Sequence, residues 1–149
     1  MARFAADDSL WPLCITMAQG RQSPDLHQRM LSEWDGWFAR GQHFLVLRVH
    51  VDAEALELAP GTGRATKQWL ASGAGEAMRR LTCAMAIVVP AACHAPSNRA
   101  SVEAIFGIPG GLFGSLDTAL DWLHLTAHLP TAAQAEALGI VTKFERDDG

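Results

Sequence analysis

The alternation of apolar and polar residues is clearest at positions 43–52, where it predicts a β-strand. Alternate positions from Leu45 to Val51 are apolar, which places them on one side of a strand with a period of two residues. The opposite side is apolar at its start and polar at its end, with Phe44 and Val46 followed by Arg48 and His50. Such a strand is covered on both faces at one end, as in a sheet that carries helices.

A helix is predicted between Ser23 and Gly41, before this strand. Ser23-Pro24-Asp25 combines an N-cap serine, a proline at the first helical position and an acid near the positive helix end. Gly41 suits the position just past the helix end. One face of the segment is apolar and is expected to pack in the core: Leu26, Met30, Trp34, Trp37 and Phe38.

Strands and helices alternate along the rest of the chain. Further strands are expected at Leu10–Met17, Thr82–Val89 and Leu112–Phe113. A helix is expected between the central strand and Thr82, with a kink or break at Gly73 and Gly75, because glycine weakens a helix interior. The positions expected to be largely buried are Trp34, Leu47, Val49, Ile87, Val88 and Leu120.

Three more helices complete the expected pattern. One runs from Pro96 to about Phe106, and the next begins at Ser115, which is placed to act as its N-cap. A short terminal helix is expected to open at Thr131 with capping-box spacing and to stop at Gly139. The charged residues 145–149 then form a frayed tail.

Composition and charge limit the classes of partner. The chain of 149 residues has a net charge of −4, which argues against a nucleic-acid binder, because such proteins usually carry a basic stripe. No apolar run reaches the roughly 18 residues that a membrane span needs. Acidic residues stand near the N-terminus, where a signal peptide would be apolar, so a cytoplasmic protein is expected. Cys14 and Cys83 lie in apolar runs and are expected to be small core residues.

The loop after the central strand is the main candidate for function. Positions 60–67 read Pro-Gly-Thr-Gly-Arg-Ala-Thr-Lys, but the Gly-Lys pair of a phosphate-binding P-loop is absent. Two interpretations remain open: ordinary helix capping, or a backbone nest that holds an anion at a helix N-terminus. The candidate partner- or anion-binding residues are Gly61, Thr62, Gly63 and Arg64.

Two other groupings have weaker chemical signals. His124 and His128 have the i, i+4 spacing of helical metal ligands, but no metalloprotease glutamate lies between them, so no metal site is predicted. Cys93 and His94 suggest a hydrolase or transferase, yet adjacent side chains seldom face each other, and no third partner can be assigned. No catalytic residue and no cofactor are therefore predicted.

The order of these segments resembles the SpoIIAA-like, or STAS-like, superfamily of small bacterial α/β domains. The resemblance covers residues from about 10 to 125 and leaves 130–149 as a C-terminal extension. It rests on the following pieces: Trp11-Pro12-Leu13, Gly20 with Ser23-Pro24, the strand at 44–52, Arg64 and Trp69, the strand at 84–89, and positions 112–123 as a closing strand and helix.

The resemblance implies a single α/β domain with a four- to five-stranded, mostly parallel sheet and helices packed on it. It also implies a non-enzymatic regulatory or protein-interaction module, with a contact surface around residues 53–64. Thr62 matches the family's phosphorylated serine in position, but the surrounding Asp-Ser-Ser-Gly motif is missing. A protein partner is expected, and a homodimer is compatible. The alternatives are a small-molecule or anion-binding domain that uses this loop and residues 93–98, and an enzyme that uses Cys93 and His94.

Overall fold

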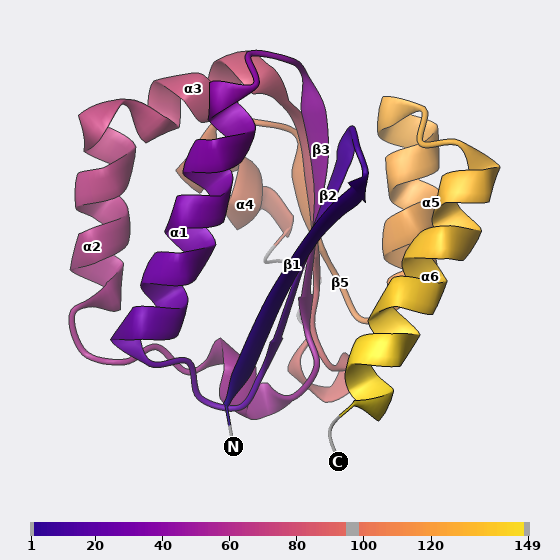
Figure 1. Cartoon of the computed structure of the whole chain (residues 1–149), viewed down its shortest axis with the longest axis horizontal. Helices are drawn as coiled ribbons and strands as arrows, with labels where there is room; N and C mark the ends of the chain where they lie inside the picture. Colours follow the sequence, from indigo (N-terminus) through magenta and orange to yellow (C-terminus); the bar gives the residue numbers. More distant parts are fainter. Residues whose placement is uncertain (1, 95–98, 148–149) are drawn as a thin grey trace.

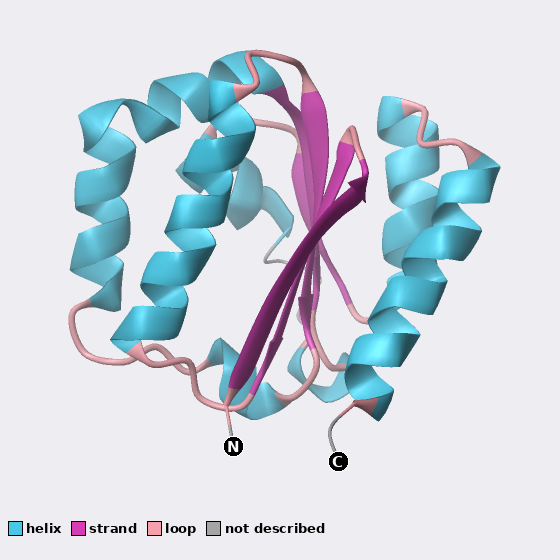
Figure 2. Cartoon of the chain, in the orientation of Figure 1, coloured by secondary structure: helices cyan, strands magenta, loops and turns pink. Residues whose placement is uncertain are grey.

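A mixed β-sheet of five strands runs through the protein, with helices on both of its faces (Figures 1 and 2). The computed structural model describes residues 2–94 and 99–147. The strands lie side by side in chain order, β1 is antiparallel to β2, and the remaining neighbours are parallel. The strands are β1 (Arg3–Leu10), β2 (Leu13–Gln19), β3 (Phe44–His50), β4 (Thr82–Val88) and β5 (Gly110–Phe113). The expected α/β fold with a mostly parallel sheet is confirmed.

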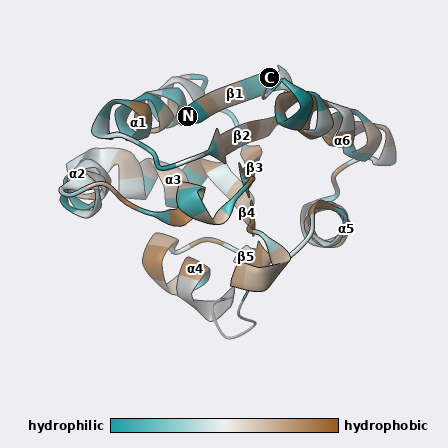
Figure 3. Ribbon diagram, turned by 90° about the horizontal axis from the view of Figure 1, so that it is seen from below, coloured by the Kyte–Doolittle hydropathy of each residue, from teal (hydrophilic) through white to brown (hydrophobic). Residues whose placement is uncertain are grey.

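The helices divide into two layers, one on each side of the sheet (Figure 3). The connections between the parallel strands form the first layer: α1 (Pro24–Ala39), α2 (Thr62–Trp69), α3 (Gly75–Leu81) and α4 (Arg99–Phe106). The second layer is the pair α5 (Leu116–Ala127) and α6 (Thr131–Arg146). Each parallel strand lies beside the preceding one, always on the same side of it. Right-handed crossovers between strands in this order all lie on one face of the sheet, which explains why α1 to α4 form a single layer.

Short irregular helices complete the connections. Two of them follow the carboxyl ends of strands: η1 (Ala53–Leu56) after β3 and η3 (Ala91–Cys93) after β4. The third, η2 (Leu70–Ala74), joins α2 to α3. Within η2, Gly73 has a φ of 113° and Ser72 also leaves the helical region, so the predicted break is confirmed. In the described part of the chain, no helix combines the length and the apolar character needed to cross a membrane.

The N-terminal segment differs from the prediction. The expected strand at Leu10–Met17 is confirmed over residues 13–17, which belong to β2, the second strand of a hairpin, whereas its first strand, β1, was not anticipated. Trp11 and Pro12 lie in the turn, where the Trp11 amide donates to the carbonyl of Asp8 at 3.0 Å. Pro12 has no amide hydrogen to donate to a ladder, so it suits this turn better than a strand.

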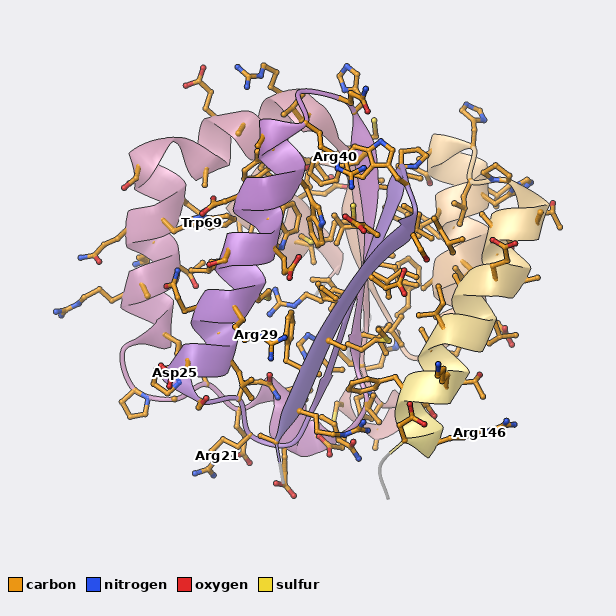
Figure 4. All side chains as sticks on the ribbon, viewed as in Figure 1. Arg21, Asp25, Arg29, Arg40, Trp69 and Arg146 are labelled. Carbon is orange, nitrogen blue, oxygen red and sulfur yellow. The ribbon has the colours of Figure 1, made fainter. Side chains whose placement is uncertain are left out.

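Arg40, just past α1, holds this hairpin in place (Figure 4). Its guanidinium donates to the carboxylate of Asp8 at 2.9 Å and lies over the ring of Trp11, 4.0 Å from the ring centre. The helix α1 itself agrees with its prediction. Ser23 caps it by accepting a hydrogen bond from the Leu26 amide, and Gly41 follows it with a φ of 66°.

The C-terminal helix is longer than predicted. Gly139 does not end it, and α6 continues to Arg146, so residues 145 and 146 belong to the helix instead of to a frayed tail. Ala137, Val141 and Phe144 are buried against the sheet, and this packing outweighs the roughly 1 kcal/mol that an exposed glycine costs a helix. The predicted capping box is also wrong, because Pro130 is the N-cap and makes no side-chain hydrogen bond. The predicted start at Pro96 and residues 148–149 lie outside the described residues.

Two apolar clusters make up the core, one on each face of the sheet. The cluster under α5 and α6 contains Leu47, Val49, Val88 and Leu120, all buried as predicted. The other cluster lies under α1 to α4 and includes the following buried side chains: Cys14, Trp34, Trp37, Phe44, Val46 and Met85.

Two side chains that were expected in the core lie elsewhere. Ile87 is only half-buried, because it lines a cavity beneath α1. Cys83 is exposed, because it lies at the amino end of β4 beside an open hollow that Trp11 and His43 also line.

Candidate functional site

A cavity of about 260 Å³ lies between α1, η1 and the carboxyl-terminal half of the sheet. Figure 3 looks onto this end of the sheet, where the loops that follow the parallel strands gather. Loops at this end of an α/β sheet are the usual position of ligand sites. The polar side chains that line the cavity come from three elements and the loop before α1: Thr16 on β2, Arg48 and His50 on β3, Gln22 in the loop, and His27 on α1.

The alternation of β3 explains why polar groups lie beneath a helix. Phe44 and Val46 point to the α1–α4 side and are fully buried in its core. Arg48 and His50 follow on the same side, two and four residues further along, where the cavity begins. In the sheet register Thr16 pairs with Arg48, so its side chain reaches the same cavity.

Arg48 supplies the central charge of the site. Among the described residues, none accepts a hydrogen bond from its guanidinium or forms an ion pair with it, and no acidic side chain lines the cavity. Burial lowers the pKa of Arg48 to about 10, so the group stays charged at neutral pH. The side chain keeps part of its surface open because it faces the cavity. A charge in such a place is costly unless a partner compensates it.

His50 adds an unsatisfied polar atom next to this charge. Its side chain is 8% exposed, and its Nδ1 has no hydrogen-bond partner in the described part of the protein. Burial and the nearby Arg48 lower the pKa of His50 to about 3, although a backbone hydrogen bond at Ala55 acts in the opposite direction. His50 is therefore neutral at physiological pH, and its Nδ1 is a buried polar atom without a partner among the described residues.

His27 joins the cavity to α2. Its Nε2 lies 2.8 Å from the hydroxyl of Thr66, and that hydroxyl donates to the carbonyl of Thr62 at 3.0 Å. Because the single hydroxyl hydrogen is used in the second bond, the hydroxyl accepts from His27, and Nε2 carries the ring proton. Burial, followed by the charge of Arg48, lowers the pKa of His27.

A second hollow of about 290 Å³ adjoins the first, between α1, α2 and α4. Four side chains line both spaces: His27, Met30, Arg48 and Leu58. The second hollow is mainly apolar, with Trp34, Trp69, Met85 and Phe106 among its lining side chains. The first cavity is also lined mainly by apolar side chains, and Arg48 lies where the two spaces meet.

The rim of the first cavity is fixed by contacts between two loops. The carboxylate of Asp52 accepts from the amides of Gly20, at 3.0 Å, and Ala55, at 2.9 Å. Arg21 and Glu57 form an ion pair between the same two loops. Gln22 lies opposite Leu58 in an isolated bridge, and its side-chain amide donates to three backbone carbonyls. The loops are therefore held together before any ligand is present.

The predicted site at 61–64 lies at the start of α2, next to this pair of cavities. Gly61, Gly63 and Arg64 are exposed, and of the four predicted residues only Gly63 lines the second hollow in the structure as described. Thr62 is 3% exposed, and its hydroxyl donates to the carbonyl of Ala59 at 2.8 Å. A kinase would reach this hydroxyl only after the turn opened, and phosphorylation of Thr62 stays a prediction.

The other candidate residues lie apart from the cavity. The Nε2 of His94 lies 3.1 Å from the carbonyl oxygen of Leu112. Among the described residues, the ring of His94 forms no hydrogen bond with the thiol of Cys93. His124 lies 2.7 Å from the carbonyl of Leu129, at the C-terminal end of α5. No group of three or more potential metal ligands occurs in the ranges 2–94 and 99–147. Residues 95–98 of the predicted 93–98 loop lie outside the description.

The prediction from sequence missed Arg48, His50 and His27 as site residues. The signal was nevertheless present, since two polar residues end one face of a strand whose other positions are apolar. That pattern fits equally well with a strand end that emerges into solvent, so it does not identify a cavity by itself. Nothing in the spacing of His27 links it to Arg48, because crossover packing alone brings them together.

Comparisons with known proteins add no family assignment. No protein-family model, no curated protein and no solved structure matches this chain. The resemblance to STAS-like domains stays a prediction.

Proposed function

We propose that this protein is a binding module, without enzymatic activity, that recognises a small organic anion in the cavity beside Arg48. The observation that carries the proposal is the guanidinium of Arg48, which faces the cavity with no acidic side chain among the described lining residues. A carboxylate would compensate the charge and form strong charge-assisted hydrogen bonds. His50 lines the same cavity, and its buried Nδ1 has no hydrogen-bond partner among the described residues.

We propose a regulatory role for this module within the cytoplasm. Its parallel strands with crossover helices and a closing helix follow the order on which the STAS-like resemblance rests, whereas β1 is not part of that resemblance. We therefore propose a STAS-like domain in which ligand binding replaces the missing serine switch. The loop at 53–64 is placed for such coupling, because Ala55, Leu56 and Leu58 line the cavity and Leu56 and Leu58 are also exposed.

The test is binding of an organic anion such as hexanoate to the purified protein and to Arg48→Met, followed by calorimetry. Loss of a charge-assisted hydrogen bond is worth about 1.5–3 kcal/mol, so the variant should bind about 10- to 150-fold more weakly. Arg64→Met is the matched control, since it removes an exposed arginine from the predicted site at the start of α2. If Arg64→Met abolishes binding and Arg48→Met does not, the anion site lies at 61–64.

A protein partner that docks on the 53–64 loop is a second candidate. The specific observation in its favour is Leu58, whose side chain is 64% exposed at the rim of both hollows. Leu58→Gln should reduce capture of the partner from a lysate of the source organism, while Leu125→Gln, at a more exposed leucine on α5, should not. Equal capture by both variants would remove this loop from the interface.

A further inference from the structure

We infer that the anion is an amphiphile with a single carboxylate, which is bound by Arg48 while its apolar tail fills the second hollow. This inference rests on the proposed function and names its ligand class. The two hollows meet at Arg48, since its side chain lines both. A molecule with its charge at that meeting point has an apolar space directly beside it.

The charge of the first cavity matches one negative charge. Arg48 is the only lysine or arginine among the described residues that line the first cavity. The two histidines there have lowered pKa values, so neither adds a full positive charge at neutral pH. A dianion such as phosphate or a dicarboxylate would retain uncompensated charge in a partly buried place, which is unfavourable. A monocarboxylate leaves no such excess.

The walls of the second hollow suit an apolar chain. Trp34, Met78 and Met85 are at most 3% exposed, and their surfaces offer carbon and sulfur atoms. The indole Nε1 of Trp69 already donates to the carboxylate of Asp35 at 2.8 Å, so the ring presents its apolar surface. Figure 4 shows Trp69 in the space between α2 and α1. Methionine side chains adapt easily to tails of different shape.

The polar groups of the second hollow are few, and one of them is already engaged. The hydroxyl of Thr66 is held between His27 and the carbonyl of Thr62. Lys67 also lines this hollow and is exposed. The remaining described lining is therefore poorly suited to a sugar, a nucleotide base or another ligand part that needs hydrogen bonds.

Exposed apolar side chains mark where the tail would enter or leave. Leu58 and Ile105 are 64% and 63% exposed, and both line the second hollow. Isolated exposed leucines and isoleucines are ordinary, but these two border the same space. At about 290 Å³ the hollow lies close to the lower end of the roughly 300–1,000 Å³ of small-molecule sites, and the first cavity extends it.

The experiment is a chain-length series from butyrate to decanoate, measured by calorimetry on the full chain below micelle-forming concentrations. Each added methylene should tighten binding about threefold to fourfold, because it transfers apolar surface out of water. Decanol and decylamine, which have the same tail without the carboxylate, should bind at least tenfold more weakly than decanoate. Binding of decanoate should depend on Arg48, with Arg48→Met as the test.

A substitution in the second hollow separates the tail from the head group. Leu70→Trp should fill the space, since Leu70 lines only the second hollow of the two, and should flatten the gain per methylene. Leu125→Trp, on the exposed surface of α5, is the matched control and should keep the wild-type gain. If Leu70→Trp does not show the wild-type circular dichroism spectrum, Leu70→Phe makes the same test with a smaller ring.

The outcomes distinguish this inference from the proposed function. Arg48-dependent binding that does not tighten with chain length overturns the tail assignment and leaves the anion site in place. Inorganic phosphate that binds more tightly than decanoate also overturns the ligand class. If no carboxylate of any length binds in an Arg48-dependent manner, both the ligand class and the proposed function are wrong.

Discussion

Acidification from pH 6.5 to 4.5 should destabilise the wild-type protein by about 2–3 kcal/mol more than it destabilises His50→Leu. In the folded protein burial and Arg48 lower the pKa of His50 to about 3, whereas an unfolded histidine titrates near its ordinary value of 6.5. Between these two values the unfolded chain binds more protons, so the free energy of unfolding falls as the pH falls. Urea denaturation of both proteins at each pH measures the difference.

The comparison isolates His50 from the other groups that surround it. His27 from α1, whose pKa is also lowered, and Arg48 from β3 are present in both proteins, so their contributions cancel in the difference. Thr16→Val is the matched control, because it changes a polar cavity residue that does not titrate. An equal pH dependence in wild type and His50→Leu would show that the pKa of His50 in the folded protein lies near its ordinary value, which would contradict the prediction.

Arg48→Met should raise the free energy of unfolding at pH 7 by about 1–3 kcal/mol in the absence of ligand. The substitution keeps an unbranched side chain of similar length and removes a charge that has no compensating partner among the described residues. The same change is expected to weaken anion binding, so stability and function should move in opposite directions. Such a trade-off between stability and function is typical of binding-site residues whose environment is unfavourable until the ligand binds.

Chemical denaturation without and with a carboxylate measures both parts of this prediction. Arg64→Met, at an exposed arginine on α2, should change the free energy of unfolding by less than about 0.5 kcal/mol. With saturating ligand, the wild type should gain stability by mass action, and Arg48→Met should gain little. A loss of more than 1 kcal/mol in ligand-free Arg48→Met would mean that the guanidinium stabilises the fold.

The parts of the fold that could be predicted from sequence are those with strong local signals. The helix α1 has an N-cap serine, a first-turn proline and a closing glycine, and all three act as predicted. The break between α2 and α3 was predictable because Gly73 and Gly75 weaken a helix interior, and in the structure Gly73 takes a backbone conformation that other residues avoid. By contrast, β1 is an edge strand with polar residues at its end, so its pattern is weak until its pairing with β2 is known.

Less of the candidate site than of the fold could be predicted from sequence. Tertiary packing decides that Arg48 ends up beneath α1 and not in solvent, and no short-range spacing encodes that result. The glycine-rich segment at 60–63 attracted the prediction because glycine and hydroxyl patterns are recognisable in sequence. The structure shows that Thr62 there is engaged in its own turn. The length of α6 was missed for a related reason, since burial of Val141 and Phe144 outweighs the local effect of Gly139.

The placement of every crossover helix on one face has a consequence for how the chain reaches its folded state. Strands β1 to β5 and helices α1 to α4 are complete by Phe113, yet the opposite face of the sheet is still bare at that point. Leu13, Ile15 and Leu47, all fully buried in the finished protein, would then face water. Only α5 and α6 cover them, so any folding intermediate that lacks these last two helices exposes the apolar face of the sheet to solvent. Aggregation during synthesis or refolding should therefore depend on how quickly the final helical pair docks.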